Sequence, residues 1–425
     1  MTVQRDDAAR PPRPDGGVRS RLPAGILDAA LASLATFVAG LAAVRVFDSS
    51  ELGIYAVFFV AFVLGQLVAY QLVYVPAEIA AVQRQGWGRL GVLEDSLRAG
   101  SGPAVVGASA VLLAALTTSR IAAGSLVAGL TATAFTATFL SPTQDHLRRT
   151  LHIADRSWDA AAMSGVQFLV TVLAVAVSIL LDVPAAWIPF GALTSANLAS
   201  MSLGLLRIGH LRRRGSGERL TLRGLARQGR WLLIQAAIPA GAAFVTANVI
   251  TFLAGPTAMG QAEAARLVAQ PLLVLAAGLI YPLRPRAMEA ALERNHAASR
   301  RAQSIFVGLM AVGTVLYAPL TAVVWPGNVF AVLVPQAYEV PWLVVATVGS
   351  NFVLGAIFLA VNELMAAGKA KSLALFNALG APVRILVATS AAFVGPFARP
   401  AAEAMGELVV IAGVVEARRR IYRPR

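Results

Sequence analysis

The sequence alternates between apolar stretches, each roughly 20 residues long, and short polar segments, a length that matches the ~30 Å hydrocarbon core of a bilayer. Within lipid, a backbone must satisfy its hydrogen bonds internally, which only helices and closed barrels achieve. Hydrophobic residues make up 57% of the chain, and the mean hydropathy is +0.68. The pattern therefore predicts an all-α polytopic membrane protein.

Twelve stretches have the length and composition of membrane-spanning helices. They cover residues 25–46, 54–75, 99–117, 121–141, 160–181, 184–206, 231–253, 264–283, 303–325, 340–361, 372–395 and 401–417. The twelfth is the weakest, because it is short and contains Glu403 and Glu407.

Positive charge lies almost entirely in every second gap between these stretches. Of the 36 Lys and Arg residues, 31 fall in the two tails and in the gaps that follow even-numbered stretches. The remaining five lie at the other ends of stretches or within one: Arg45, Arg120, Arg266, Arg399 and Arg384. Because cytoplasmic loops carry the excess of Lys and Arg, both termini are predicted to be cytoplasmic. Membrane topology thus explains the net charge of +14 without a nucleic-acid partner.

The longest gap, residues 207–230, divides the stretches into two sets of six and contains eight arginines. Within 219–230 the arginines recur every three or four residues between leucines. This spacing predicts either a basic amphipathic helix bound to anionic lipids of the inner leaflet or an ordinary cytoplasmic connector.

A faint internal repeat supports the division into halves. Gly53 and Gly260 occupy similar positions in the turns that follow the first and seventh stretches, where glycine permits a tight turn. We therefore expect two six-helix bundles related by a parallel repeat. The predicted organisation is a disordered basic cytoplasmic tail (1–24), an N-terminal bundle (25–206), a basic cytoplasmic linker (207–230), a C-terminal bundle (231–417) and a second basic tail (418–425).

Several kinds of chemistry lack their motifs. The chain has no cysteine and no glycine-rich phosphate loop followed by Lys and Ser or Thr. Its four histidines are scattered in or beside the predicted cytoplasmic loops, and no Ser/His/Asp grouping indicates a hydrolase. The sequence predicts neither an enzyme nor a metal or other cofactor, which leaves a transporter that works without nucleotide.

Three regions resemble polysaccharide-biosynthesis flippases, the Wzx-type O-antigen and capsule translocases of the multidrug/oligosaccharidyl-lipid/polysaccharide (MOP) exporter superfamily. The matching segments are Gly25–Ala30, Ala43–Phe47, Glu51–Ala56, Met259–Ala262, Ala265–Leu267, Gln270–Leu272, Pro282–Arg286, Arg148–Arg149 and Ala154–Arg156. The resemblance implies two bundles, as in multidrug and toxic compound extrusion (MATE) transporters, that rock about a central cavity. The chain departs from the family pattern, because few of its cationic residues lie at membrane depth.

The resemblance also implies an inner-membrane flippase. Its cargo would be a lipid-linked oligosaccharide for a cell-surface polysaccharide such as lipopolysaccharide, and its partners glycosyltransferases or a polymerase of the same pathway. Two alternatives remain open. One is an H⁺- or Na⁺-coupled multidrug exporter of the same superfamily, which would favour carboxylates in its cavity. The other is a non-transporting scaffold of a glycan-assembly complex, whose gap between bundles would be filled by apolar side chains.

Arg384 is the leading candidate for substrate binding. It lies about 12 residues into the eleventh stretch, roughly 18 Å along a helix, where a charge is costly and usually functional. Its guanidinium could bind a phosphate or pyrophosphate. Glu407 in the twelfth stretch lies at nearly the same depth, so a structural ion pair is the competing interpretation, and Glu407 is also a candidate for ion coupling.

Four further residues are weaker candidates. Arg45 and Arg266 could form a cationic outer half of the cavity, or contact headgroups and, for Arg266, a nearby glutamate. Tyr70 and Gln71 could contact sugar, or belong to an interfacial aromatic belt.

Asp28, near the inner end of the first stretch, could bind a coupling cation or cap the cytoplasmic end. Other uncharged polar residues within the stretches are expected either to line a hydrated cavity or to form interhelical hydrogen bonds. They are Gln66, Gln167, Asn197, Asn248, Gln270, Asn351 and Asn377.

Overall fold

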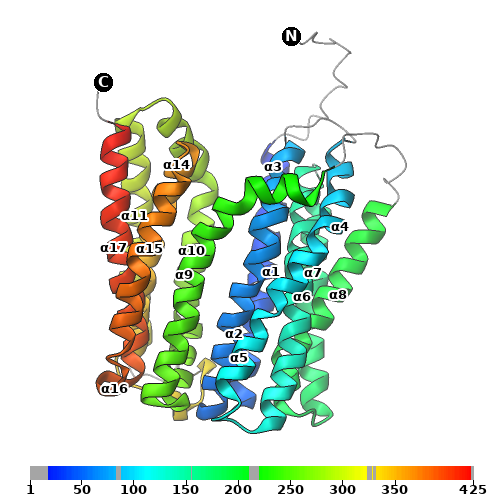
Figure 1. The fold of residues 1–425 in the computed structure, drawn as a ribbon, viewed down its shortest axis with the longest axis vertical. Helices are drawn as coiled ribbons and strands as arrows, with labels where there is room; N and C mark the ends of the chain where they lie inside the picture. The colour runs from blue at the N-terminus through cyan, green and yellow to red at the C-terminus, as the bar shows by residue number, and fades with distance from the viewer. Residues whose placement is uncertain are drawn as a thin grey trace.

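A computed structural model of the protein describes residues 18–82, 88–154, 156–209, 220–322, 328 and 332–422. All regular secondary structure within those ranges is helical (Figure 1). Ten helical segments are long and apolar enough to cross a membrane. The predicted sixth and twelfth stretches lie on α8 and α17, two further helices of 22 and 24 residues. The predicted all-α membrane fold is confirmed.

The first half of the chain forms α1 to α8. Their bounds are α1 Val18–Val46, α2 Ser49–Ala69, the π-helical segment η1 Tyr70–Tyr74, α3 Val75–Val82, α4 Gly88–Ala108, α5 Ala110–Thr118, α6 Gly124–Ile153, α7 Ser157–Leu180, η2 Ala185–Trp187 and α8 Ile188–Gly209.

The second half forms α9 to α17. Their bounds are α9 Leu222–Ala254, α10 Pro256–Leu292, α11 His296–Ala322, η4 Gln336–Tyr338, α13 Leu343–Ala356, α14 Phe358–Ala366, α15 Ala370–Ala388, α16 Ala391–Val394, η5 Gly395–Phe397 and α17 Ala398–Ile421.

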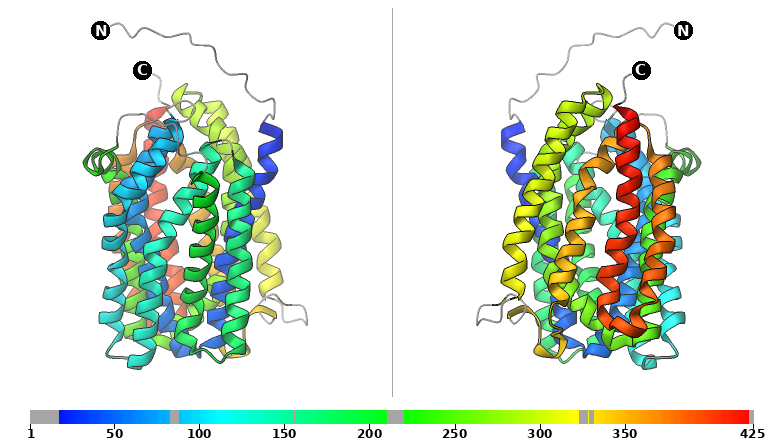
Figure 2. Two further views of the ribbon diagram at one scale, coloured as in Figure 1. Left: turned by 90° about the vertical axis from the view of Figure 1, so that its right-hand side faces the viewer. Right: turned by 90° about the vertical axis from the view of Figure 1, so that its left-hand side faces the viewer.

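The two halves form two bundles that lie side by side (Figure 1). We call α1–α8 the N-terminal bundle and α9–α17 the C-terminal bundle. Figure 2 shows that α1 begins and α17 ends at the same end of the molecule, which we call the terminal end. This agrees with an even number of membrane crossings. That the terminal end faces the cytoplasm stays a prediction from the charge distribution.

The bundles meet where α2 and α10 begin, at the end opposite the termini. Asp48 starts α2 by accepting hydrogen bonds from the backbone N–H groups of Ser50 and Glu51, both at 2.8 Å. The Glu51 carboxylate accepts in return from the Asp48 N–H at 3.3 Å, which completes a capping box. Gly255, with φ of 86°, makes the turn, and Pro256 is the first residue of α10.

Gly53 and Gly260 hold these two helices in close contact. A Cβ on Gly53 would collide with the Pro256 carbonyl oxygen, and a Cβ on Gly260 with the Ser49 carbonyl oxygen. Neither glycine has a positive φ, so the expectation that they serve a tight turn is wrong. They are needed because the two backbones approach too closely for any side chain, and the contact is reciprocal between the halves.

Helix α9 begins on the N-terminal bundle. Its first part runs across the terminal end beside α3 before the helix turns into the C-terminal bundle (Figure 1). Leu225, only 3% exposed, packs into an apolar cluster with Val73, Tyr74 and Ala77. Arg223 and Arg227 are exposed. The amphipathic segment thus buries its apolar side against protein, and its binding to anionic lipid stays a prediction for the arginine side.

Several boundaries of the predicted domain organisation fall inside observed helices. Helix α1 begins at Val18, inside the predicted tail 1–24, of which residues 1–17 lie outside the described residues. Within the predicted linker, α9 begins at Leu222 because Leu225 is buried, while residues 210–219 lie outside the described residues. Helix α17 continues to Ile421 because Arg418 is anchored by an ion pair, and residues 423–425 are not described.

Candidate functional site

Asp28 on α1 is the centre of a buried polar network at the terminal end of the N-terminal bundle. Its side chain, 7% exposed, lies between α6 and α7. One carboxylate oxygen lies 3.1 Å from a guanidinium nitrogen of Arg148 and 2.9 Å from Nε2 of His152. The other oxygen accepts a hydrogen bond from the Ser164 hydroxyl at 2.6 Å. The carboxylate is therefore fully engaged by protein groups.

Arg148 extends this network to the surface of α6. Its second terminal nitrogen donates to Asp145 at 2.6 Å, while its Nε has no hydrogen-bond partner. Arg149 lies 3.8 Å from the other Asp145 oxygen and sits over the Tyr70 ring, 4.9 Å from its centroid. At 47% exposure, Arg149 is a cation available to a ligand beside a candidate sugar-stacking ring.

A second set of hydrogen bonds joins uncharged side chains of α6, α7 and α8. Gln144 donates to Gln167 at 3.2 Å and to Ser200 at 3.1 Å. Gln167 donates to Asn197 at 2.9 Å, and Asn197 donates to Ser141 at 2.8 Å. Gln167 and Asn197 thus form the interhelical bonds that were one of the two expectations for them.

Asn351 and Asn377 also bond between helices. They donate to the carbonyls of Ala269, at 3.0 Å, and Gln235, at 3.1 Å. Asn248 instead bonds to Phe244 within its own helix, at 2.8 Å.

Tyr70 and Gln71 belong to η1, a π-helical turn between α2 and α3. Such turns often occur at functional sites, because the extra residue re-aims neighbouring side chains. Gly229 of α9 packs directly on the backbone carbonyls of Gln71 and Leu72. The π-helical turn is therefore one of the places where α9 contacts the N-terminal bundle, beside its contacts with α2 and α3.

The end of η1 leads into another buried group. The Tyr74 ring stacks on His146, with 4.4 Å between ring centroids and 9° between planes. His146 lies 3.2 Å from Glu78 and 2.8 Å from the Ser96 hydroxyl. Among the described residues, no group of three or more His, Asp or Glu side chains is arranged to hold a metal ion.

Arg384 and Glu407 form an ion pair in the C-terminal bundle. They lie on α15 and α17, with 3.4 Å between a guanidinium nitrogen and the carboxylate. Arg384 also donates to the Pro239 carbonyl of α9 at 3.2 Å, and its Nε has no hydrogen-bond partner. Gly380 and Gly406 bring the two helices close together at this point. The pair thus joins α9, α15 and α17. This is the structural ion pair that the sequence offered as the alternative to substrate binding by Arg384.

Arg266 lies near the opposite end of the molecule in a cluster of charges. It makes three hydrogen bonds to Glu263, the shortest at 2.6 Å, and lies 4.7 Å from the centroid of the Phe59 ring. Glu263 also accepts from Arg399 at 2.7 Å, and Arg399 lies 3.4 Å from Glu403. The Arg266 guanidinium is neutralised, although its side chain remains 21% exposed.

Arg45 stands apart from these groups. It donates a hydrogen bond of 2.7 Å to the backbone carbonyl of Val332, in the segment before α13. This contact joins the last turn of α1 to the C-terminal half of the chain.

The structure thus places the seven candidates in separate groups. Arg384 meets Glu407, and Tyr70 adjoins Gln71, whereas Asp28, Arg45 and Arg266 each have other partners. Sequence reasoning missed Arg148 and His152 because the fourth stretch was ended at residue 141, while α6 continues to Ile153. The spacing of Asp145, Arg148, Arg149 and His152 on one helical face was the available signal.

Buried carboxylates in the described residues share one property. There are four of them, and each forms an ion pair with arginine. They are Asp28, Glu263, Glu363 and Glu407. None of them is a free anionic site for a cationic ligand in this conformation.

Comparison with solved structures identifies the fold as that of MOP superfamily transporters. The chain is similar to the inward-facing conformation of a multidrug resistance MATE family transporter of that superfamily, with a TM-score of 0.67 and 13% identity over 93% of this chain and 98% of that one. It is also similar to the lipid II flippase MurJ in an inward closed conformation, with a TM-score of 0.64 and 12% identity over 94% and 90%.

A MOP superfamily transporter from Pyrococcus furiosus is a third similar structure, with a TM-score of 0.63 and 14% identity over 94% of both chains. No protein-family model and no curated protein matches the sequence. At these identities the likeness establishes the fold and leaves the cargo open.

Proposed function

We propose that this protein is an inner-membrane flippase that moves a lipid-linked oligosaccharide of the polyprenyl-phosphate type by alternating access. The observation that carries the proposal is that all four buried carboxylates in the described part of the chain pair with arginine. A cargo with a phosphate or pyrophosphate group requires cationic or neutral donors, whereas a cationic drug requires unpaired carboxylates. The cargo would serve cell-surface polysaccharide synthesis beside glycosyltransferases or a polymerase.

The fold supports this proposal, because solved structures of the same architecture include a lipid II flippase. Two of the arginines described above are candidates to contact the anionic headgroup of the cargo. Arg149 offers an exposed guanidinium above Tyr70, next to Gln71. Arg384 holds Glu407 at 3.4 Å, longer than the ~2.7–2.9 Å of a strong charge-assisted hydrogen bond, so a phosphate oxygen can compete for it.

A cation-coupled multidrug exporter is the second candidate, favoured by the likeness to a MATE transporter. In that case Asp28 or Glu407 would exchange its arginine for a coupling ion during transport. The two functions differ in the charge of their cargo, so one preparation can test both.

The experiment uses the full chain in proteoliposomes with two cargoes, a polyprenyl-pyrophosphate oligosaccharide and the cation ethidium. Enzymatic trimming of the exposed glycan reports flipping, and dye fluorescence reports export. We expect glycan exposure to depend on the protein and to fall at least tenfold in Arg384→Gln, with no ethidium transport. Ethidium transport without glycan exposure would establish the exporter instead, and transport of neither would favour the scaffold.

A further inference from the structure

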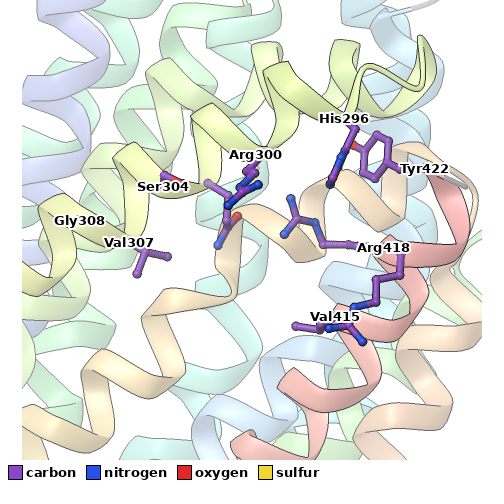
Figure 3. A pocket seen from close by; sticks show the side chains of 10 residues that line it. His296, Arg300, Ser304, Val307, Gly308, Val415, Arg418 and Tyr422 are labelled. Atoms are coloured by element: carbon purple, nitrogen blue, oxygen red, sulfur yellow. The ribbon is translucent and has the colours of Figure 1, made fainter.

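A pocket of about 830 Å³ opens between α11 and α17 at the terminal end of the C-terminal bundle. Figure 3 shows side chains of the two helices converging on it from opposite sides. Both helices pack against α13, and the pocket lies above the junction of α13 and α14. There, Gln303 of α11 donates to the Ala356 carbonyl at 2.9 Å.

The pocket is cationic. Arg300, Arg418 and Arg419 line it, together with His296 and Tyr422, whose rings lie 5.2 Å apart. Glu363 compensates the charge of Arg418, but the guanidinium groups of Arg300 and Arg419, from two helices at one opening, favour an anion between them.

Only one of the three arginines is committed to a carboxylate of its own. Arg418 lies 2.8 Å from Glu363 and donates to the Ser299 hydroxyl at 2.7 Å, so it is part of the protein's internal structure. Neither Arg300 nor Arg419 forms an ion pair within the described part of the chain. Two guanidinium groups on opposite walls are therefore available to a ligand.

The deeper wall of the pocket is apolar. Val307 and Gly308 on α11, with Val415 on α17, continue from the arginines toward the middle of the spanning helices. A Cβ added to Gly308 would meet no atom within 4 Å, so this glycine leaves open space beside the pocket. A cationic opening above an apolar wall matches an amphiphile that carries a phosphate.

We propose that this pocket binds the phosphate group of an anionic membrane phospholipid, with Arg300 and Arg419 as the donors. Its acyl chain would lie along Val307, Gly308 and Val415. Guanidinium suits this ligand because its forked N–H groups match two phosphate oxygens. Arg419 lies about 18 Å along α17 from Glu407, and the site does not depend on the transported cargo. The bound lipid adds a second link between α11 and α17, beside the hydrogen bond from Arg418 to Ser299.

The test compares two double variants of the full chain in detergent by native mass spectrometry with phosphatidylglycerol. Arg300→Gln with Arg419→Gln removes both pocket donors. Arg301→Gln with Arg420→Gln removes the same charge from the next residue of each helix, at exposed positions outside the pocket lining. We expect at least about a tenfold loss of phosphatidylglycerol affinity in the first variant and little change in the second. Equal loss in both would overturn the proposal.

A second arm distinguishes a lipid from free phosphate. Gly308→Leu fills the apolar wall and leaves the arginines intact, so we expect it to weaken phosphatidylglycerol while competition by sodium phosphate stays weak. If sodium phosphate displaces phosphatidylglycerol at equal concentration and Gly308→Leu binds the lipid like the wild type, the pocket is an inorganic anion site and the lipid assignment is wrong.

Discussion

The carboxylate of Asp28 in the N-terminal bundle has three partners within 3.1 Å, whereas Glu407 in the C-terminal bundle has Arg384 at 3.4 Å as its one described partner. Arg148, which serves Asp28, also holds a second carboxylate at 2.6 Å. Arg384 has only a backbone carbonyl, that of Pro239, as its other acceptor. At the first site Asp28 and Arg148 each have several polar partners, whereas at the second one ion pair is supported by one hydrogen bond to a backbone carbonyl. A contact of that kind can change partners at low cost.

This difference predicts, first, a large loss of stability for Arg148→Leu. The substitution takes from Asp28 its arginine partner, although His152 and Ser164 remain, and it leaves Asp145 with only the more distant Arg149. Removing one member of a buried ion pair costs about 3–5 kcal/mol. Thermal unfolding in detergent, followed by size-exclusion chromatography, measures the effect. The control is Arg149→Leu, one residue along the helix and 47% exposed, which should cost less than about 1 kcal/mol. If Arg148→Leu and Arg149→Leu lowered stability equally, the buried network around Asp28 would contribute no more than a surface arginine does.

Second, the Arg384–Glu407 pair should behave as an isolated unit. Arg384→Leu alone should lower stability by roughly 2–3 kcal/mol, because Glu407 is left buried without its partner. Adding Glu407→Leu should restore stability to within about 1 kcal/mol of the wild type, since two apolar side chains can replace a buried pair. A double-mutant cycle gives the coupling energy. If the double variant is no more stable than the single one, the pair belongs to a larger network and the comparison fails.

Third, the contact between the bundles should be separable from both charge sites. Gly260→Ala places a methyl group against the Ser49 carbonyl and should cost about 1–3 kcal/mol through overpacking. Gly278→Ala in the same helix meets no atom within 4 Å and should be neutral or slightly stabilising. Thermal unfolding distinguishes them. The Arg384–Glu407 coupling energy should be unchanged in Gly260→Ala, and a change would show that the sites communicate.

The smallest expected effect is at the π-helical turn. Tyr70→Leu removes the ring beneath Arg149 and should cost about 0.5–1 kcal/mol, the usual worth of an exposed cation–π contact. Tyr70→Phe keeps the aromatic ring and should retain most of the stability that the cation–π contact contributes. Glycan exposure should follow the same order if Tyr70 stacks on sugar. Similar losses in Tyr70→Phe and Tyr70→Leu would place the effect on the hydroxyl.

The helical class and the helix positions could be predicted from the sequence because lipid imposes one local requirement, an apolar run of sufficient length. The site could not be predicted to the same extent, because its partners are remote in sequence. Arg148 lies 120 residues from Asp28, and Arg399 lies 136 residues from Glu263. Charge patterning located Arg384 and suggested Glu407, since both are charged residues within apolar stretches and lie at similar depths in the predicted helices. It could not indicate that Pro239 lies opposite them.

Glycine shows the same limit on a smaller scale. The sequence indicated that Gly53 and Gly260 were equivalent but suggested the wrong reason, a turn. The reason is visible only when α2 and α10 are placed together, with each glycine against a carbonyl of the other helix. Because glycine has no side chain, the sequence around it does not indicate which part of the protein its backbone contacts.

Helix α9 has a mechanical consequence for any movement between the bundles. It is one unbroken helix from Leu222 to Ala254, seated on the N-terminal bundle at Leu225 and Gly229 and contacted by Arg384 at Pro239. About ten residues, or ~15 Å, separate the seat at Gly229 from the contact at Pro239. A rotation of the N-terminal bundle at this end therefore moves α9 as well. The movement is transmitted to the Pro239 carbonyl, which accepts a hydrogen bond from Arg384, and so to the Arg384–Glu407 pair, the longest ion pair of a buried carboxylate in the described residues.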